Sequence, residues 1–393
     1  MPGESFVKGA GNEKLLVFTV SLAFLAGAVM GAFAGGSQES HSGPALTQAP
    51  ANFDDLVKAA QKEGQLTVIA LPRNWLNYGE AIDTFAKKYG IKVNELNPDG
   101  GSGDELQAIQ ANKDNKGPQA PDVIDVGFSF GPDAKKAGLL APYKVRTWST
   151  IPDSVKDADG CWYGDYYGVM AFEVNVDVVK TPPLDWPDLL AAAYKGQVAL
   201  TGDPRVSNQA IMAVAAANLA NGGTFDNSKP GVDFFAKLNS TGNFVPLIAK
   251  IGTVASGETP VAVTWDYLAM ADRDSAAGNP NIAVIVPTSG VLAGVYAQAI
   301  SAYAPHPAAA RLWEEFLYAD EGQLIWLKGY GHPIRYADLA ARNVIPDELA
   351  AKLPPASYYA KAVFPTLPQQ GAAKTYITSN WDSIVGVNVQ AKQ

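Results

Sequence analysis

The chain has 393 residues, which is long enough for two domains that each bury a core of their own. Hydrophobic residues make up 47% and charged residues 18%, a composition typical of folded proteins that excludes a disordered chain. The net charge of −9 argues against a nucleic-acid partner, because phosphate binding needs a basic face. A single cysteine, Cys161, excludes a disulfide within the chain.

The first 36 residues have the features of an export signal. Lys8 and Lys14 precede an apolar run at 15–34, and small residues follow it. The run is close to the ~20 residues that span a bilayer, so an uncleaved N-terminal anchor is an alternative to a cleaved signal peptide. Both interpretations place the rest of the chain in the periplasm or outside the cell. Residues 37–51 are rich in Ser, Gly, Pro and Gln, which predicts a flexible tether.

Helix and strand patterns alternate in the first part of the chain. Asn52 as N-cap and Gly64 as terminator predict a helix at 53–62. The elements that follow are strand 66–71, helix 79–88, strand 91–96, helix 104–112, strand 122–126 and helix 132–137. This alternation predicts an α/β fold with mostly parallel sheets and helices on both faces.

A long strand at 166–175 opens a second alternating series. Its predicted elements are helix 187–194, strand 198–201, helices 208–221 and 232–238, strand 259–264, helix 267–277 and strand 282–287. From Val295 onward the chain is predicted to be rich in helix, with helices at 307–318 and 321–328.

Polar and aromatic residues follow two of the predicted strands. One cluster around Trp75 follows strand 66–71, and the other follows strand 259–264 and consists of Trp265, Asp266 and Tyr267. Ligands of open α/β sheets lie at the carboxyl ends of strands, so we expect the two clusters to face each other across a cleft. Two Gly/Ser-rich turns at helix starts add backbone N–H groups and the hydroxyls of Ser102 and Ser129 as candidate ligand contacts.

Several short motifs between Phe53 and Trp381 follow one another in a characteristic order. They are Gly90-Ile91-Lys92-Val93, Pro121-Asp122-Val123-Ile124, Lys136-Ala137-Gly138-Leu139, Tyr194-Lys195-Gly196, Asp203-Pro204-Arg205, Gly257-Glu258 and Gly329-Tyr330-Gly331-His332-Pro333. Their order resembles that of the extracellular solute-binding proteins of ABC importers. The subgroup in question includes binders of ferric iron, polyamines, phosphonates and thiamine.

The resemblance implies a two-lobed, type II periplasmic-binding-protein fold. Each lobe would be a mixed, mostly parallel sheet flanked by helices, with the ligand cleft between the lobes. Lobe 1 would comprise residues 52–165 and 289–393, and lobe 2 residues 166–288, joined by hinge strands near 166–175 and 286–296. The lobes would close on a small-molecule ligand and dock on a membrane permease. We expect a monomer without enzymatic activity, metal or cofactor.

The resemblance to polyamine binders also implies ligand contacts. Trp75 and Tyr78 match a Trp-x-x-Tyr spacing that lines the cleft in that group. Trp265 matches a tryptophan that follows the Gly-Glu strand, and Asp203 matches a carboxylate that receives an amine. Aromatic walls favour an ammonium group through cation–π contacts. Tyr167, at the first crossing, completes this part of the predicted site.

Some positions depart from the polyamine pattern. Val206 stands where a second carboxylate is expected, and Gly294 and Tyr296 stand where a tryptophan and an aspartate are expected. These departures disfavour a long polyamine and favour a shorter amine-bearing ligand. Tyr296 is kept as a predicted ligand contact.

Arg205 leaves the other end of the ligand open. If its guanidinium faces the cleft, it would bind a phosphonate or carboxylate in a bidentate way. Together with Asp266, it would then suit a zwitterion such as an aminophosphonate. Alternatively, Arg205 pairs with Asp203 and orders the loop.

Three other functions are weighed. Ferric binders place two adjacent tyrosines after the Gly-Glu strand, whereas here Tyr267 is followed by Leu268, which leaves one phenolate too few for hard Fe³⁺. A thiol-dependent enzyme would use Cys161 with His306 or His332, but the flanking residues of papain-like sites are absent. An anchored sensory module on the same fold is the third alternative.

Overall fold

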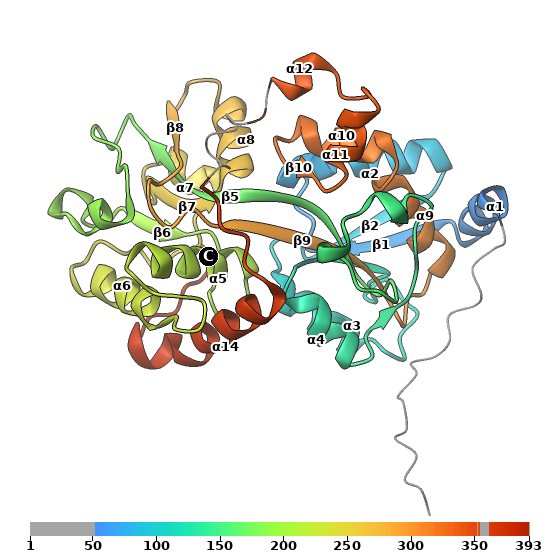
Figure 1. Ribbon diagram of the computed structural model, residues 1–393, viewed down its shortest axis with the longest axis horizontal. Coiled ribbons are helices and arrows are strands. Elements are labelled where there is room, and N and C mark those ends of the chain that lie inside the picture. The colour runs from blue at the N-terminus through green and yellow to red at the C-terminus, as the bar shows by residue number, and fades with distance from the viewer. Residues whose placement is uncertain (1–51, 352, 354–360, 393) are drawn as a thin grey trace, which may run out of the picture. The chain divides into compact units, whose positions relative to one another are not determined.

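The computed structural model describes residues 52–351, 353 and 361–392 (Figure 1). The predicted export segment at 1–36 and the tether at 37–51 therefore lie outside the described residues. Within the described ranges, no helix is both long enough and apolar enough to cross a membrane. We keep the names lobe 1 and lobe 2 for the two sets of elements that strands β5 and β9 connect.

Lobe 1 begins with the predicted helix α1 (Phe53–Glu63). The Asn52 side chain accepts a hydrogen bond from the backbone N–H of Asp55 at 2.9 Å, and Gly64 ends the helix at φ 71°. Strand β1 (Gln65–Ile69) pairs in parallel with β2 (Lys92–Leu96), and α2 (Tyr78–Tyr89) connects them. The pattern-based prediction of these elements is confirmed to within a few residues.

An eight-stranded sheet runs through the described residues in the order β3-β9-β5-β7-β6, with β4, β8 and β10 paired at its side. Its strands are β3 (Val123–Gly127), β4 (Leu140–Ala141), β5 (Tyr163–Asn175), β6 (Val198–Leu200), β7 (Val261–Trp265), β8 (Ile282–Ile285), β9 (Ala293–Ser301) and β10 (His332–Pro333). β6 pairs with β7 in parallel, as predicted. The two crossing strands instead pair antiparallel with every neighbour, because β5 and β9 run in opposite directions between the lobes.

Strands β5 and β9 lie side by side where the chain passes between the lobes (Figure 1). The first half of β5 pairs with β9, and Met170–Val174 pairs with β7 in lobe 2. All nine residues of β9 are buried. The sequence prediction placed helix-rich chain from Val295 and missed most of this strand, because its alanines carry little strand signal.

The remaining helices of the described residues pack around the sheet and against one another. They are α3 (Ser102–Ala111), α4 (Phe130–Lys136), α5 (Asn208–Ala220), α6 (Lys229–Ser240), α7 (Ile251–Ala255), α8 (Asp266–Ala276), α9 (Pro307–Leu317), α10 (Asp320–Lys328), α11 (Tyr336–Ala341), α12 (Asp347–Ala350) and α14 (Leu367–Ile384). The helix predicted at 187–194 is wrong in type. It consists of two short 3₁₀ segments, η4 (Trp186–Leu190) and η5 (Ala192–Tyr194), because Ala191 between them is extended at ψ 147°.

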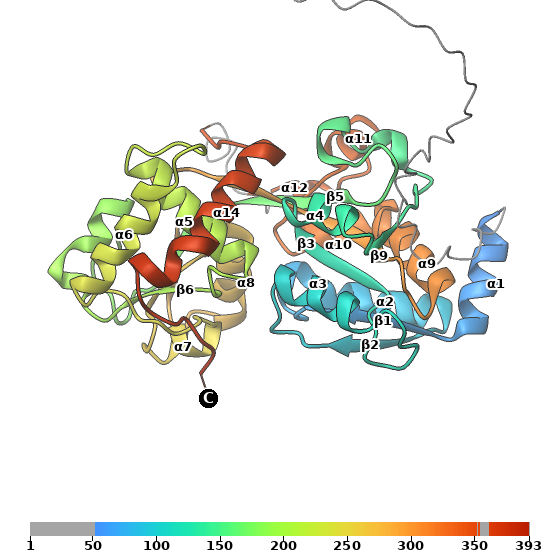
Figure 2. The same cartoon turned by 90° about the horizontal axis from the view of Figure 1, so that it is seen from below.

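Helix α14 is the element that the sequence prediction missed at the end of the chain. Its apolar positions Ala373, Ile377 and Trp381 recur at helical spacing and are buried. The helix packs against α5 and α6 of lobe 2 (Figure 2), although residues 289–393 were assigned to lobe 1 from the sequence. Lys374, in its first half, pairs with Asp133 of α4 in lobe 1. Helix α14 therefore contacts both lobes.

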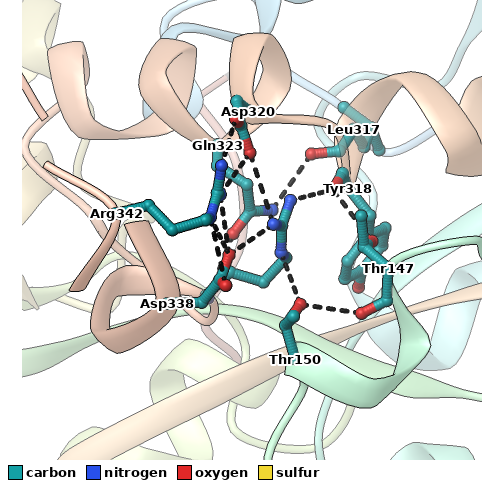
Figure 3. A network of polar contacts seen from close by, with 9 residues as sticks. Thr147, Thr150, Leu317, Tyr318, Asp320, Gln323, Asp338 and Arg342 are labelled. Carbon is teal, nitrogen blue, oxygen red and sulfur yellow. Dashed lines mark hydrogen bonds and ion pairs between the residues drawn. The ribbon is translucent and has the colours of Figure 1, made fainter. Parts of the chain in front are cut away.

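A polar network holds α10 and α11 together in lobe 1. Arg342 donates to Asp320 and to Asp338, both at 2.7 Å (Figure 3). The buried Arg335 pairs with Asp338 and donates to Thr150 of the short 3₁₀ segment η2 (Trp148–Thr150) at 2.7 Å. These charge-assisted contacts hold α10 and α11 in place relative to each other. Their residues are not part of the cavity lining described below.

Candidate ligand-binding site

A cavity of about 300 Å³ is lined by residues of both lobes. Its lobe 1 wall is formed by the segments that follow β1 and β2, including Trp75 and residues 98–102, 104 and 105. Its lobe 2 wall is formed by the segments that follow β6 and β7, including residues 201–203 and 206–209. The walls thus lie at the carboxyl ends of four strands, which is where ligands of open α/β sheets bind.

Two helix N-termini from opposite lobes meet at this cavity. α3 begins at Ser102, and α5 begins at Asn208 with Ser207 as its N-cap. The backbone N–H of Gly103 donates to the carbonyl oxygen of Val206 at 3.2 Å, which joins the two lobes directly. The N–H groups of Gly101 and Gly103 already have acceptors within the protein, but a helix N-terminus also carries a partial positive charge, so this part of the cavity favours an anionic group.

Two glycines allow the lobes to approach so closely. A Cβ atom on Gly101 would lie 3.2 Å from the Cα of Ser207. A Cβ atom on Gly127, at the end of β3, would lie 1.9 Å from the Cγ of Asn208, so a side chain there would require the Asn208 side chain to move. The present position of the Asn208 side chain against the end of β3 therefore depends on the absence of a side chain at Gly127.

Trp75 is held at the cavity by a strained segment. Ala70, Leu76 and Asn77 all have positive φ, at 54°, 42° and 62°, although none is glycine. Such conformations are unfavourable for Ala70 and Leu76, less so for Asn77, and persist where surrounding contacts enforce them. The Trp75 indole N–H donates to the Tyr166 hydroxyl at 2.7 Å, and its ring packs edge-on against Tyr296 with centroids 5.4 Å apart.

Below Trp75 lies a buried carboxylate that receives two phenols. The hydroxyls of Tyr78 and Tyr166 each donate to Asp125 Oδ2 at 2.7 Å. Burial raises the pKa of Asp125 to about 6, against the lowering effect of these hydrogen bonds. The side-chain amide of Gln298 donates to the Tyr78 hydroxyl at 2.8 Å and so completes a connected network.

The cavity lining is strongly acidic. It contains seven carboxylates and, as its only basic side chain among the described residues, Lys250. The seven are Asp99, Asp104, Glu105, Asp125, Glu173, Asp203 and Asp272. An excess of negative groups around a partly enclosed cavity favours a ligand with positive charge.

Five of these carboxylates have partners within the protein. Asp99 pairs with Lys250, and Asp104 accepts from the N–H of Gly101 at 2.9 Å. Glu105 accepts from the N–H of Asp125 at 2.9 Å, Asp125 accepts from the tyrosines, and Asp203 pairs with Arg205. Within the described part of the chain, Glu173 and Asp272 have no hydrogen-bond or ion-pair partner for their carboxylates.

Four of the predicted ligand contacts line the cavity, namely Trp75, Ser102, Asp203 and Tyr296. Ser102 is largely buried there, and its hydroxyl accepts from the N–H of Gly127 at 3.0 Å. Asp203 is held by Arg205, which donates to both of its oxygens at 2.6–3.0 Å. Of the two alternatives for Arg205, the pairing with Asp203 is the one present in the structure.

Four other predicted contacts are buried behind the cavity wall, namely Tyr78, Trp265, Asp266 and Tyr267. The rings of Trp265 and Tyr267 stack with centroids 6.2 Å apart, and the Trp265 side chain is 0% exposed. The Asp266 carboxylate accepts from the N–H groups of Val169 and Tyr267, each at 3.0 Å. These residues support the wall on which Trp75 and Tyr296 lie.

The last three predicted contacts lie elsewhere in the structure. Ser129 is buried at the start of α4, and Arg205 is turned toward Asp203, Asp382 and Asn388. Tyr167 stacks on His332 with centroids 4.8 Å apart. None of the three is part of the cavity lining. Their role as ligand contacts stays a prediction from the sequence.

Sequence reasoning missed Glu173 and Asp272. Glu173 interrupts the buried apolar run of β5 between Phe172 and Val174, and a charged residue inside such a run was an available signal. Asp272 carried no comparable signal, because it is one of several acidic residues along α8. Only the folding of α8 against β5 brings it to the same cavity.

A family model for bacterial extracellular solute-binding proteins matches residues 119–361. The match covers more than half of the chain, and the chain belongs to this family. Its members are periplasmic or extracellular solute-binding components of ABC importers, which bind small molecules and deliver them to a membrane permease.

One curated relative and two solved structures show which proteins of known or proposed ligand the chain is similar to. A periplasmic protein of Salmonella typhimurium, provisionally named for binding 2-aminoethylphosphonate, is 25% identical over 272 residues, or 66% of this chain and 74% of the relative. The structure of the periplasmic binding protein P5PA has a TM-score of 0.65 at 21% identity, covering 82% of this chain and 99% of its own. Iron-bound HitA from Pseudomonas aeruginosa has a TM-score of 0.62 at 19% identity, with the same coverage. The predicted two-lobed α/β fold is thereby confirmed.

Proposed function

We propose that this solute-binding protein captures a small zwitterion of the aminoalkylphosphonate type in the cavity between Trp75 and lobe 2. The observation that carries the proposal is that the cavity lining combines two helix N-termini with carboxylates that have no partner. The N-termini of α3 and α5 favour an anionic group, while carboxylates without an internal partner favour an ammonium group. A ligand with both groups satisfies both parts of the lining.

The size of the cavity supports a short ligand. Small-molecule sites in proteins span roughly 300–1,000 Å³, and a cavity of about 300 Å³ stands at the lower end of that range. Trp75 and Tyr296 supply aromatic surface for the short alkyl part. The provisional name of the Salmonella typhimurium relative supports the same class of ligand.

Other ligands of the family have less support from the lining. A polyamine carries no anionic group to meet the N-termini of α3 and α5. Ferric iron needs several anionic oxygens, and the predicted phenolate ligand Tyr267 is buried behind the wall at 1% exposure. We therefore place the aminoalkylphosphonate class first and these two classes after it.

We further propose that the chain acts as a monomeric binder without enzymatic activity. Burial raises the pKa of the Cys161 thiol to about 11, so at neutral pH it is protonated and a poor nucleophile. The net charge of −9 disfavours nucleic-acid binding.

Isothermal titration calorimetry on the full-length chain tests the ligand class. We expect 2-aminoethylphosphonate to bind more tightly than either ethylphosphonate, which lacks the amine, or putrescine, which lacks the anion. Fe³⁺ serves as the metal comparison. Tighter binding of putrescine or Fe³⁺ than of 2-aminoethylphosphonate would overturn the proposal.

A further inference from the structure

Two carboxylates of the cavity lining, the buried Glu173 and the half-buried Asp272, stand out by their lack of partners. Glu173 lies in the middle of β5, where it pairs across the sheet with Ala262 of β7 and Val284 of β8. Its side chain is 2% exposed, and its Oε1 atom has no hydrogen-bond partner among the described residues. Asp272, on α8, lines the same cavity. A buried polar atom without a partner is unfavourable unless a ligand satisfies it.

The elements packed around Glu173 supply no cation to neutralise it. β7 (Val261–Trp265), β8 (Ile282–Ile285) and α7 (Ile251–Ala255) contain no charged side chain. Lys250, which precedes α7, pairs with Asp99 across the cavity. Glu173 and Asp272 therefore face the cavity without a counter-ion from these elements.

Helix α8 itself also leaves the pair without a counter-ion. Arg273 is directed to Asp274 at 2.9 Å, with both side chains about half exposed. The Asp266 carboxylate accepts backbone N–H groups. Among the described residues, the charge that acts on Glu173 is that of Asp272, and it has the same sign. Two like charges at one site, one buried and one half-buried, favour retention of a proton by one of them.

We propose that Glu173 and Asp272 form the subsite for the ammonium group of the ligand, and that one of them releases a proton to solvent when this group enters. The inference rests on the proposed function, because it names the groups that hold the cationic end of that ligand. In the empty site, one carboxyl keeps its O–H bond. When the ammonium enters, that O–H bond breaks, the proton passes to buffer, and two carboxylates accept hydrogen bonds from the ammonium N–H groups.

The titration behaviour of the pair agrees with its geometry. Burial, followed by the charge of Asp272, raises the pKa of Glu173 well above its ordinary value. Burial raises the pKa of Asp272 to about 6. An adjacent ammonium lowers both pKa values again, because it favours the charged form of each carboxyl. The complex therefore binds fewer protons than the free protein.

Release of a proton makes affinity depend on pH with a defined sign. Where the free pair holds a proton and the complex does not, raising the pH by one unit increases the affinity by about tenfold. Above the pKa of the free pair the affinity becomes independent of pH, because no proton remains to be released. We therefore expect affinity to rise from pH 5 and then level off.

Calorimetry with 2-aminoethylphosphonate in two buffers of different ionisation enthalpy measures the released proton directly. At pH 6 we expect close to one proton released per ligand by the wild-type protein. Ethylphosphonate carries the same phosphonate but no amine, and its binding controls for titration of that group. Glu173→Gln and Asp272→Asn should each weaken the binding of 2-aminoethylphosphonate at least tenfold, which is the size expected for loss of one hydrogen bond to a charged group. The affinity for ethylphosphonate should stay within about threefold of the wild-type value.

Asp233→Asn, which removes an exposed carboxylate on α6, is the matched control and should change neither affinity nor proton release. Thermal unfolding checks that each variant is folded, and if Glu173→Gln does not fold, the half-buried Asp272 carries the test. Wild-type binding without proton release, or unchanged affinity in both variants, overturns the subsite.

A simple alkylammonium probe, n-propylammonium, separates the two proposals. If wild-type protein binds it with proton release but does not bind 2-aminoethylphosphonate, the proposed ligand class is wrong and the subsite stands. If 2-aminoethylphosphonate binds but the variants bind it equally well, the ligand class stands and the subsite is wrong. Failure to bind either compound overturns both.

Discussion

Two carboxylate pairs in this molecule, each with at least one fully buried member, differ in what surrounds them. In lobe 1, Asp125 and Asp165 receive hydrogen bonds from tyrosine hydroxyls, from a backbone N–H and from Gln298. In lobe 2, Glu173 and Asp272 receive none from the described residues. Burial raises the pKa of members of both pairs. Asp125 Oδ1 is also without a hydrogen-bond partner among the described residues, but its Oδ2 accepts from two tyrosines. The difference teaches that the lobe 1 pair is held by donors of the fold, whereas the lobe 2 pair, which has none, awaits a ligand.

The largest effect is expected when the acceptor of the lobe 1 pair is removed. Asp125→Ala leaves the buried hydroxyls of Tyr78 and Tyr166 without their acceptor, which we expect to lower the free energy of unfolding by about 3 kcal/mol. Urea denaturation measures this change. Asp125→Asn, which keeps an oxygen acceptor, should lose less than half as much. Equal stability of Asp125→Ala and wild type would show that the two pairs do not differ in this way.

An effect of the opposite sign is expected at the lobe 2 pair, and it depends on pH. The pKa of Asp272 is raised to about 6 in the folded state, so the folded protein holds a proton that the unfolded chain has lost between pH 4 and 6. Wild-type stability therefore falls across this window as pH rises. Asp272→Asn lacks this titration. Between pH 4 and pH 7 we therefore expect the free energy of unfolding of this variant to rise by about 2 kcal/mol relative to that of the wild type.

Urea denaturation of both proteins at several pH values measures this difference. The exposed variant Asp233→Asn provides a control with the same change in formal charge. A difference between Asp272→Asn and wild type that stays constant with pH would mean that Asp272 titrates normally in the folded protein.

The smallest effect is expected at a carboxylate of the cavity that already has a cation. Asp203 is paired with Arg205, whose side chain is 30% exposed and has further partners in Asp382 and Asn388. Asp203→Asn should change the free energy of unfolding by less than about 1 kcal/mol, as is usual for partly exposed pairs. Calorimetry should show a smaller loss of 2-aminoethylphosphonate affinity than in Glu173→Gln. If Asp203→Asn loses as much affinity for 2-aminoethylphosphonate as Glu173→Gln does, Asp203 is the carboxylate that receives the amine.

Much of the fold could be predicted because it depends on local signals. Asn52 and Gly64 bound α1 through contacts within a few residues, and the apolar runs of β6 and β7 needed no tertiary information. Strand β9 was largely missed because its alanines become strand only through pairing with β3 and β5. The same holds for η4 and η5, where Ala191 interrupts a helical pattern.

The candidate site could be predicted only in part, because it depends on the direction of side chains. Trp75 and Trp265 both follow buried strands, yet Trp75 lines the cavity and Trp265 is fully buried against Gly294. Sequence patterns do not distinguish these outcomes. Glu173 and Asp272 are distant in sequence, and their meeting depends on how α8 packs on β5.

The contact between Gly127 and Asn208 has a consequence for the evolution of cargo size. A residue larger than glycine at position 127 would require the Asn208 side chain to turn away or α5 to move from β3, because a Cβ atom there would lie 1.9 Å from the Cγ of Asn208. Where α5 moves, the space enclosed by the lobes increases, although no residue of the cavity lining has been substituted. A single substitution at such a position offers a lineage a route to bulkier nutrients that leaves the chemistry of recognition intact.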